Sequence, residues 1–494
     1  MKPTRFELVA LLTAAGIIAY QLFVPPLIGL ADSGDFGRVI AWKGLGHVST
    51  EYNDMYFRYF NSQYRFLTKL PGPEEYKTST SFLVIPAMKL SILAGQDRIF
   101  DIRILATLYV LLYLFGIWLI LLATRSLGSK VRVVFSALLI LIFTDVGYVA
   151  YFNSFYSEGT ALAFLSIALG CALILIAEES SSTLYLIGYF LAVGMAVTSK
   201  PMYVPLTPAF ALFGIYITKY VRFFKRYWIV SGVAVLLCCV SFWYLRQVPA
   251  MWSLQSIYVE LFTDMLPHSN DPRQDLAELG LDPDYAAFSG TTPFQPDSPL
   301  RVDPKFQDDL RTKVTSYTFP LFYLTRPGRL YGLSVRCVKH AFTTRVDRLG
   351  YYEASAGKPP FAKPFGIWSV VREKTFPRSV PFFGLFFATA FGVLLLLIRK
   401  SSAKLRGIYF VYLLFVFIAL AQFFIAIAAG GGEPDVGKHL FMFNLAFDAC
   451  FFLLILGAIH SASILTLYLR FGHIRHNPGY NSQDHTSQKQ TPEA

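Results

Sequence analysis

Residues 8–38 read LVALLTAAGIIAYQLFVPPLIGLADSGDFGR, an uncharged apolar run followed at once by two aspartates. The apolar part, 8–30, is long enough to cross a bilayer. Asp32 and Asp35 therefore stand where such a helix leaves the membrane. One interpretation is a solvated helix cap, because Asp and Ser commonly begin helices. The other is a catalytic carboxylate at the membrane surface, and the rest of the chain has to distinguish the two.

The composition predicts a polytopic membrane protein. Of the 494 residues, 54% are hydrophobic and 15% are charged, against about a quarter charged in soluble proteins. Apolar runs of spanning length recur along the chain. The net charge of +12 does not indicate a nucleic-acid partner, because much of the basic excess falls in short loops between apolar runs. The five cysteines show neither a disulfide framework nor a metal-ligand spacing.

The apolar runs predict about ten transmembrane helices. The predicted spans are 8–30, 104–123, 133–151, 160–177, 184–198, 205–217, 229–245, 381–398, 408–429 and 440–469. Lys2 and Arg5 place the N-terminus in the cytoplasm by the positive-inside rule, and the alternation then puts every strongly basic short loop on that side. The run 81–94 is short and contains Pro86 and Lys89, so we predict an interfacial helix there.

This topology divides the chain into four parts. They are a transmembrane module 1–246 with a first external loop 31–103, an external region 247–378, C-terminal transmembrane helices 379–470, and a disordered cytoplasmic tail 471–494. Tyrosines between Tyr52 and Tyr64, interleaved with Arg58 and Arg65, predict a further helix in the headgroup layer. The region 247–378 is too long for an ordinary connection and predicts loops and short helices. The absence of any Asn-x-Ser/Thr sequence favours the plasma membrane of a bacterium, with both termini cytoplasmic.

Polar residues collect on the side predicted to be external. The set is Asp32, Asp35, Asn153, Glu158, Lys200, Asp435, Lys438 and His439. A single ionisable group near a helix end is often a snorkelling anchor, but eight on one face predict a site. Acids beside cations at a bilayer surface suit a substrate with an apolar tail and a charged head, such as a polyprenyl-phosphate sugar. Its phosphate needs Lys, Arg or His, and the acceptor hydroxyl needs a carboxylate base. One base and a direct displacement predict inversion at the anomeric carbon, by analogy with glycoside hydrolysis.

Four islands resemble the bacterial glycan biosynthesis hexose transferase (WsfD-like) family. They are DSGDFGR at 32–38, YFNSFYSE at 151–158, TSKPM at 198–202 and EPDVGKHLFMFNLAFD at 433–448. The first span, the acidic motif, the short apolar run 78–95 and Arg103 at the start of the next span are similar to GT-C membrane glycosyltransferases, such as protein O-mannosyltransferases and the lipid A aminoarabinose transferase. The resemblance implies an all-α GT-C-like bundle, an undecaprenyl-phosphate-linked sugar donor and a cell-envelope glycan acceptor.

The resemblance also implies catalytic and acceptor residues. In GT-C enzymes the first external loop supplies the catalytic acid-type residue, which means Asp35 or Asp32 here. We favour Asp35, because Asp32 is nearer the helix end and better placed to cap it. Glu158, Asn153 and Asp435 are expected to orient the acceptor or a metal. The metal is unknown, and a divalent cation held by Glu158 and the two aspartates is one option.

The donor phosphate is expected to contact a set of cations. Lys200, Lys438 and His439 are the candidates from short external turns, and Arg326 and Arg329 are further candidates from the long external region. The prediction as a whole requires the acids of the first loop, Glu158 and the two lysines to surround one external cavity.

Two other classes of protein share part of this pattern. A transporter or flippase should show internal repeats and ionisable groups at mid-membrane, whereas only Asp145 and Asp448 lie well inside predicted spans. A polymerase or ligase of lipid-linked glycans would also bind a lipid phosphate, but typically through external Arg and His rather than an acid directly after the first span.

Overall fold

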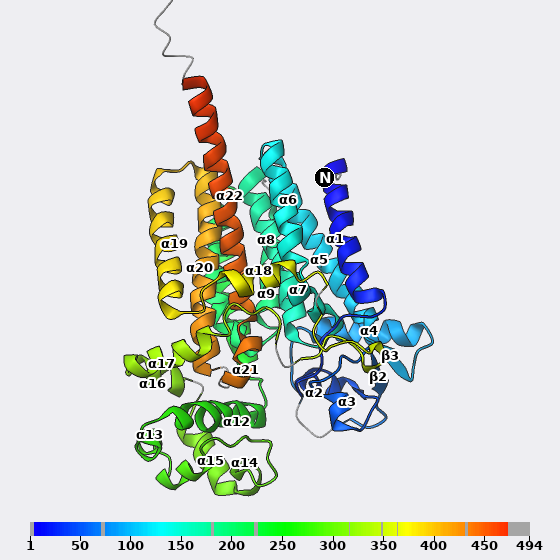
Figure 1. Ribbon diagram of the computed structural model, residues 1–494, viewed down its shortest axis with the longest axis vertical. Coiled ribbons are helices and arrows are strands. Elements are labelled where there is room, and N and C mark those ends of the chain that lie inside the picture. The colour runs from blue at the N-terminus through cyan, green and yellow to red at the C-terminus, as the bar shows by residue number, and fades with distance from the viewer. Residues whose placement is uncertain are drawn as a thin grey trace, which may run out of the picture.

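The computed structural model describes residues 4–70, 75–178, 182–221, 226–315, 317–346, 349–362, 364–429 and 433–472. Helices form nearly all of the regular structure in these ranges. The longest helices stand side by side, and the shorter elements gather at one end of the bundle (Figure 1). We call this the loop end, and the opposite end, which holds the N-terminus, the N-terminal end. Arg222 and Lys225, residues 430–432 between two predicted spans, and the predicted disordered tail from residue 473 onward lie outside the described residues.

Ten helices of the described chain form the bundle, and each overlaps one predicted span. They are α1 (Arg5–Phe23), α5 (Arg103–Ala123), α6 (Ser129–Phe143), α8 (Ser157–Glu178), α9 (Thr183–Val197), α10 (Thr207–Ile217), α11 (Arg226–Leu245), α19 (Val380–Lys400), α20 (Ala403–Ala429) and α22 (Phe441–Gly472). The all-α polytopic membrane fold is thereby confirmed.

Not every bundle helix is long enough to span a membrane by itself. Within the described ranges, seven helices are long and apolar enough, and an eighth is added if α6 and its bent continuation at Val146–Asn153 form one span. The apolar part of α22, Phe441–Gly457, is shorter. So is α9, whose 15 residues reach about 22 Å, against a hydrocarbon core of about 30 Å.

Small residues let α5 and α8 approach closely. A Cβ added to Gly116 of α5 would lie 2.1 Å from the hydroxyl oxygen of Ser166 on α8. A Cβ added to Gly170 would lie 2.5 Å from the Cβ of Leu119. Close backbone approach at small residues is a main source of helix association in membranes. It fixes the position of α8, whose first turn carries Glu158.

The N-terminal end is held together by a buried carboxylate. Glu7 of α1 is fully buried, and its side chain lies 2.7 Å from Nε of Arg125 and also pairs with Arg132. Thr4 caps α1 through a reciprocal hydrogen bond with Glu7. These contacts tie α1 to the turn between α5 and α6.

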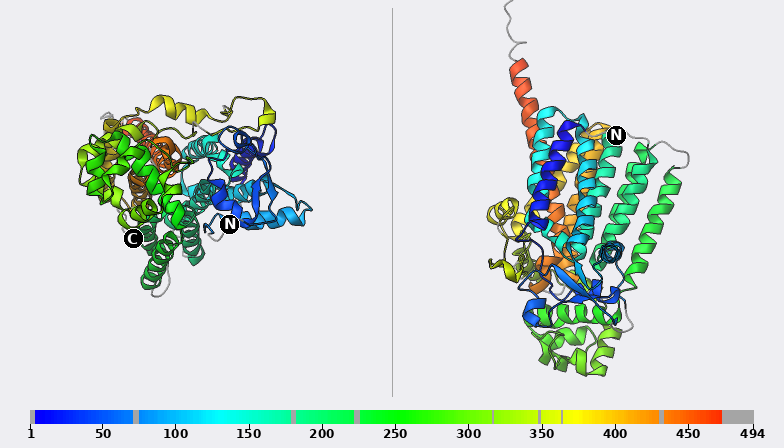
Figure 2. Two further views of the ribbon diagram at one scale, coloured as in Figure 1. Left: turned by 90° about the horizontal axis from the view of Figure 1, so that it is seen from below. Right: turned by 90° about the vertical axis from the view of Figure 1, so that its right-hand side faces the viewer.

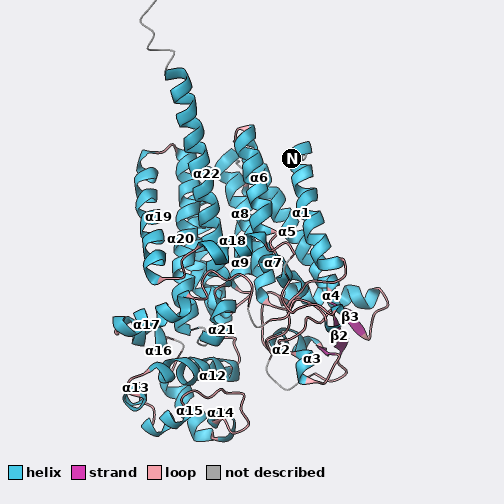
Figure 3. Ribbon diagram, viewed as in Figure 1, coloured by secondary structure: helices cyan, strands magenta, loops and turns pink. Residues whose placement is uncertain are grey.

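The first polar segment forms a small layer at the loop end. Its elements are α2 (Phe36–Ile40), β1 (Leu45–His47), α3 (Tyr52–Met55), β2 (Gln63–Phe66), α4 (Ser81–Leu93) and β3 (Ile99–Asp101). The three strands form one antiparallel sheet with β2 in the middle (Figure 3). The helix α4 lies across the bundle axis (Figures 1 and 2), and its Leu93 is 83% exposed.

The predicted helix between Tyr52 and Arg65 is wrong. Only the short α3 is helical there, and the segment Gln63–Phe66 is the central strand. The reason is its alternation of polar and aromatic residues, which is the period of a strand. The alternation buries Tyr64, whose ring lies 4.8 Å from that of Phe155, while Arg65 stays exposed.

The region after α11 forms short helices, most of them at the loop end, with the last one, Ile367–Thr375, beside the bundle helices (Figure 1). They are α12 (Ala250–Tyr258), a π-helical turn at Val259–Met265, α13 (Pro272–Glu278), α14 (Pro299–Val302), α15 (Pro304–Lys313), α16 (Thr318–Leu324), α17 (Pro327–Val338) and α18 (Ile367–Thr375). An aromatic core holds the first of them together, with the ring of Phe306 at 5.9 Å from Tyr258 and 5.5 Å from Phe262.

A buried polar network attaches α18 to the bundle. Arg372 and Asp448 are both fully buried, and Nη1 of Arg372 lies 3.0 Å from Oδ2 of Asp448 on α22. The same carboxylate oxygen accepts hydrogen bonds from the hydroxyl of Tyr148 and the indole of Trp368. Arg372 also donates to Oδ1 of Asn444 at 2.7 Å. Asp448, one of two acids inside predicted spans, is thus an anchor for a helix of the long polar region.

Candidate active site

The DSGDFGR stretch forms a turn organised by Asp32. This side chain is 2% exposed, and its Oδ1 accepts hydrogen bonds from the backbone amides of Gly34 at 2.7 Å and Phe36 at 3.0 Å. Its Oδ2 lies 3.0 Å from Nε2 of His47 on β1. Gly34 has φ of +94°, a conformation that glycine adopts without strain. Both oxygens of Asp32 are therefore used in holding the turn and starting α2.

Asp35 faces the other way, toward residues from the end of the chain. Its Oδ2 forms an ion pair with Lys438, which lies on α21 (Glu433–His439). Nζ of Lys438 also contacts the hydroxyl of Ser33 at 3.1 Å. Nη1 of Arg38, one turn along α2, lies 3.2 Å from Oδ1 of Asp35. Burial by itself would raise the pKa of Asp35, but the nearby Lys438 and Arg38 charges outweigh it and hold this pKa well below its usual range.

A second ion pair joins Glu158 and Lys200. Glu158 lies in the first turn of α8 and is 1% exposed, and Nζ of Lys200 is 2.7 Å from its Oε1. The Lys200 charge also lowers the pKa of Asp35, so the two ion pairs share one electrostatic environment. Tyr76 lies among the same groups: burial raises its pKa to about 12, and the charges of Arg38, Asp35 and Glu158 all act on it.

Three polar atoms at this place have no hydrogen-bond partner among the described residues. They are Nδ1 of His439, the hydroxyl of Tyr203 and Nε of Arg38, all of them buried. Burial, followed by the charges of Lys200 and Lys438, lowers the pKa of His439 well below its usual value, so its imidazole is neutral at pH 7. Unpaired buried polar groups are rare in folded proteins and typically mark a place where a ligand or water binds.

Three of the predicted site residues, Asn153, Arg326 and Arg329, lie or point elsewhere, and the side chain of a fourth, Asp435, is not described. Asn153 is buried and donates from its side-chain amide to the carbonyls of Leu22 at 3.0 Å and Ile28 at 2.8 Å, which anchors the chain after α1. Asp435 lies on α21, but its side chain is outside the described part. Arg326 pairs with Glu278, and Arg329 lies 2.6 Å from Oδ2 of Asp275, so both attach α17 to α13. The structure brings neither arginine to the two ion pairs.

The described carboxylates do not fit a metal ion. Within the ranges that the structure describes, no three side chains of His, Cys, Asp or Glu are grouped closely enough to hold one. Asp32, Asp35 and Glu158 instead each contact a different basic side chain. We therefore derive no chemistry from a divalent cation.

Among the residues of this cluster that sequence reasoning missed, Arg38 and Tyr156 lie in the quoted islands. Arg38 contacts Asp35, and its guanidinium also lies 4.5 Å from the centre of the Trp252 ring on α12. Tyr156 accepts a hydrogen bond from the amide of Ser33 and donates one to the carbonyl of Ala31, both at 2.9 Å. The spacing of Arg38 from Asp35, one helical turn, was a usable signal. No sequence signal pointed to the long-range contact of Tyr156.

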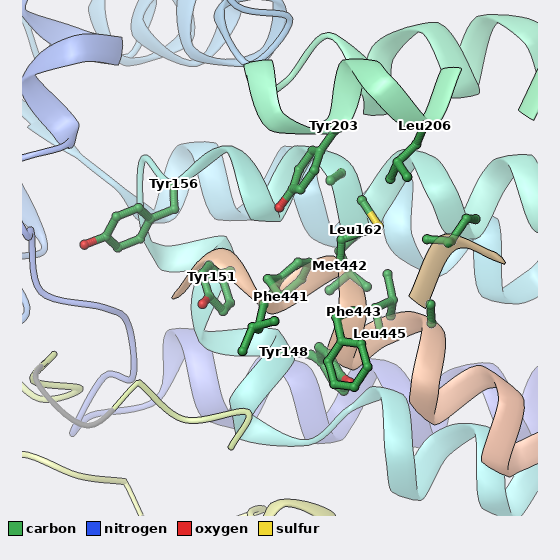
Figure 4. Close-up of a cluster of buried hydrophobic side chains, with 14 of the residues drawn as sticks. Tyr148, Tyr151, Tyr156, Leu162, Tyr203, Leu206, Phe441, Met442, Phe443 and Leu445 are labelled. Atoms are coloured by element: carbon green, nitrogen blue, oxygen red, sulfur yellow. The ribbon is translucent and has the colours of Figure 1, made fainter. Parts of the chain in front are cut away.

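An apolar cavity begins close to these charges. Leu162 lines it, one helical turn along α8 from Glu158, and further lining residues come from seven bundle helices, including Phe210 of α10 and Leu445 of α22. Figure 4 shows Leu162 and Leu445 in the same buried cluster as Tyr203. Glu158 and the nearest lining residue of this apolar space are thus one helical turn apart on α8, an arrangement that suits an amphiphilic ligand.

A protein-family model matches this chain. The family model described as YfdI N-terminal transmembrane domain matches residues 2–473, which is nearly the whole chain. No curated protein matches the chain.

Proposed function

The chain belongs to the family of the YfdI N-terminal transmembrane domain, and on that premise we propose that it is an inverting membrane glycosyltransferase. It moves a hexose from a polyprenyl-phosphate donor to a cell-envelope glycan or lipid-linked acceptor. The observation that carries the proposal is the pair of neighbouring acid–lysine contacts, Asp35 with Lys438 and Glu158 with Lys200, beside an apolar cavity.

The donor matches this combination of charge and apolar space. Its phosphate needs cations, and Lys438, Arg38 and Lys200 supply three of them in one environment. The unpaired Nδ1 of His439 and hydroxyl of Tyr203 supply further hydrogen-bonding capacity. The polyprenyl chain needs apolar surroundings, and the apolar cavity lined by Leu162 and Leu445 is a candidate place for part of it.

Asp35 is the proposed base. The acceptor hydroxyl oxygen attacks the anomeric carbon from the face opposite the phosphate, and its proton passes to the Asp35 carboxylate. The bond between the anomeric carbon and the phosphate oxygen breaks, and polyprenyl phosphate leaves with the electron pair. Asp32 is the weaker alternative, since both its oxygens already hold the turn. Glu158 keeps Lys200 in place and orients the acceptor.

Donor binding would itself activate this base. With Lys438 and Arg38 beside it, Asp35 has a pKa well below its usual range and is a weak proton acceptor. A bound phosphate draws the same two cations toward itself. The pKa of Asp35 then rises toward its ordinary value, so the carboxylate becomes a better base only when the donor is in place.

The distribution of basic residues supports one orientation of the protein in the proposed bacterial plasma membrane. Arg125 and Arg132 lie at the N-terminal end, which by the positive-inside rule faces the cytoplasm. The loop end then faces outward, where a cell-envelope acceptor is found. The long region 247–378 covers this end and shapes the acceptor site. The donors to test first are hexoses linked to undecaprenyl phosphate, because the resemblance to the WsfD-like family implies a donor of this kind.

The test is sugar transfer by purified full-length protein from synthetic polyprenyl-phosphate hexoses to envelope glycan fragments. We expect a product whose anomeric configuration is opposite to that of the donor, read by NMR coupling constants. Retention of configuration would refute the single displacement. Lipid binding without transfer, together with movement of the lipid across proteoliposomes, would replace the enzyme with the flippase alternative.

A further inference from the structure

A second pocket lies on the surface of the loop end, apart from the two ion pairs. It has a volume of about 220 Å³, and its walls include Tyr52, Asn53, Tyr56, Phe57, Arg58 and Phe361. Gly350 and Pro360 also line it. Tyr52, Phe57 and Phe361 are 62%, 38% and 37% exposed, so part of each aromatic side chain is accessible to a ligand.

Arg58 is the charged side chain of this pocket, and no acid lines it in the described structure. The Arg58 guanidinium lies 4.9 Å from the centre of the Tyr59 ring. The side chains of Asn53 and Arg58 are exposed at the pocket. Aromatic faces with a few hydrogen-bonding side chains, in a small concave site, are the surface that a hydroxylated ring requires, because its C–H face is apolar and its hydroxyls are polar.

The backbone at the pocket is held in a costly conformation. Phe57 has φ of +59°, which is rare for an aromatic residue. Its amide donates to the carbonyl of Asp32 at 2.8 Å, and its carbonyl accepts from the amide of Gly350 at 2.8 Å. Gly350 has to be glycine, because a Cβ there would lie 2.0 Å from the carbonyl oxygen of Arg58. The chain thus fixes the aromatic walls on the same backbone that carries Asp32.

Side chains connect the pocket to the proposed active site. The ring of Tyr52 lies 5.1 Å from that of Tyr56, whose ring lies 5.3 Å from the imidazole of His47. His47 in turn contacts Asp32, three residues before Asp35. The helix α3, which carries Tyr52, lies farther from the bundle than the transverse helix α4 (Figure 1). The segment that carries Tyr52 therefore lies at the loop end, on the side that the proposed orientation puts outside the membrane.

We propose that this pocket binds a sugar ring of the acceptor glycan and holds that glycan beside Asp35. The assignment of the glycan as acceptor rests on the proposed function, whereas sugar binding at the pocket does not. At about 220 Å³ the pocket is below the usual range of small-molecule sites, roughly 300–1,000 Å³, and suits a single ring.

The test measures binding of soluble hexose and N-acetylhexosamine trisaccharides to the full-length protein in nanodiscs by saturation-transfer NMR. We expect wild type and Tyr52→Phe to bind alike, and Tyr52→Ala to bind about five- to tenfold more weakly, because stacking is lost. Tyr331→Ala, which removes an exposed tyrosine from α17, is the matched control. Absence of trisaccharide binding to wild type, or equal binding by Tyr52→Ala, overturns the proposal.

A second measurement separates this inference from the proposed function. Hydrolysis of the polyprenyl-phosphate hexose by water needs the donor site but no acceptor. Tyr52→Ala should keep the wild-type hydrolysis rate and raise the KM for the acceptor. If wild type neither hydrolyses nor transfers, the proposed function fails while the trisaccharide binding still decides the pocket. If Tyr52→Ala leaves the acceptor KM unchanged, the pocket does not hold the acceptor.

Discussion

Replacing Asp35 by asparagine should separate the chemistry of the site from its affinity for the donor. The variant keeps the shape of the side chain but removes the proposed base, so we expect the transfer rate to fall about 10²- to 10⁴-fold, or about 3–5 kcal/mol in the barrier. It also removes the acid that competes with the donor phosphate for Lys438 and Arg38. The donor should therefore bind more tightly to the inactive variant.

The size of the affinity gain follows from the geometry of the ion pair. A charge-assisted hydrogen bond is worth about 1.5–3 kcal/mol when shielded from water. The Lys438 side chain is 5% exposed but that of Asp35 is 24% exposed, so solvent reduces the contribution. Taking about 1–2 kcal/mol, the donor should bind about 5- to 30-fold more tightly to Asp35→Asn.

The assay combines initial transfer rates with equilibrium binding of a labelled polyprenyl-phosphate hexose in nanodiscs. Asp97→Asn, the same substitution at an exposed position of the same polar segment, is the control and should leave both quantities unchanged. Lys438→Met should do the opposite of Asp35→Asn and weaken donor binding. A transfer rate above a tenth of the wild-type value in Asp35→Asn would refute the role of base. Weaker donor binding by that variant would refute the competition for cations.

Three further predictions concern stability. Arg372→Met leaves the Asp448 carboxylate buried without its cation, so the free energy of unfolding should fall by about 3–5 kcal/mol in chaotrope titrations. The double variant Arg372→Met with Asp448→Leu should recover part of the lost free energy. An unchanged free energy of unfolding in the single variant would contradict the role of the pair. Gly116→Leu forces α5 away from α8 and should lower the free energy of unfolding by about 1–3 kcal/mol. Gly232→Leu should leave it unchanged, because a Cβ at Gly232 meets nothing within 4 Å. Equal Tm values for the two variants would refute the packing argument. The pKa of Asp35 is depressed in the folded protein, so on acidification the unfolded chain takes up this proton first, near pH 4. The ion pair of Asp35 therefore stabilises the protein fully above about pH 5 and loses this effect as the pH falls below that value. Asp35→Asn should show a smaller drop in Tm than wild type between about pH 5 and 3, and an identical drop would contradict the pairing.

The sequence was informative where a single physical rule determines the outcome. Long uncharged runs such as 8–30 can only be buried in lipid or protein, so every predicted span overlaps a helix. Side chains at helix ends on one side of a bundle are forced toward one another, which is why Asp35, Glu158 and two lysines share one environment. The sequence does not distinguish the roles of Asp32 and Asp35. The structure shows that the Asp32 carboxylate holds the turn and that the Asp35 carboxylate faces the cations.

The sequence did not predict which residues far apart in the chain contact one another in the fold. The sequence suggested that Arg326 and Arg329 are free cations in a basic turn, but both form ion pairs with nearby acids of α13. The strand Gln63–Phe66 depends on partners about 20 and 35 residues away, and a run of tyrosines and arginines gives no register for them. The pocket at Tyr52 needs Phe361 from the other half of the chain, so its walls cannot be recognised from either segment alone.

The contact between Asp35 and Lys438 also has a consequence for biogenesis. Residue 35 is synthesised early and residue 438 late, so a chain emerging from the ribosome carries its acidic motif for most of translation without the lysine that neutralises it. The ion pair is completed only when α20 and α22 have been inserted and α21 is folded between them. Under the proposed function, an unfinished or truncated copy therefore lacks one of the cations that would contact the donor phosphate, and it would not draw on the cell's supply of lipid carrier.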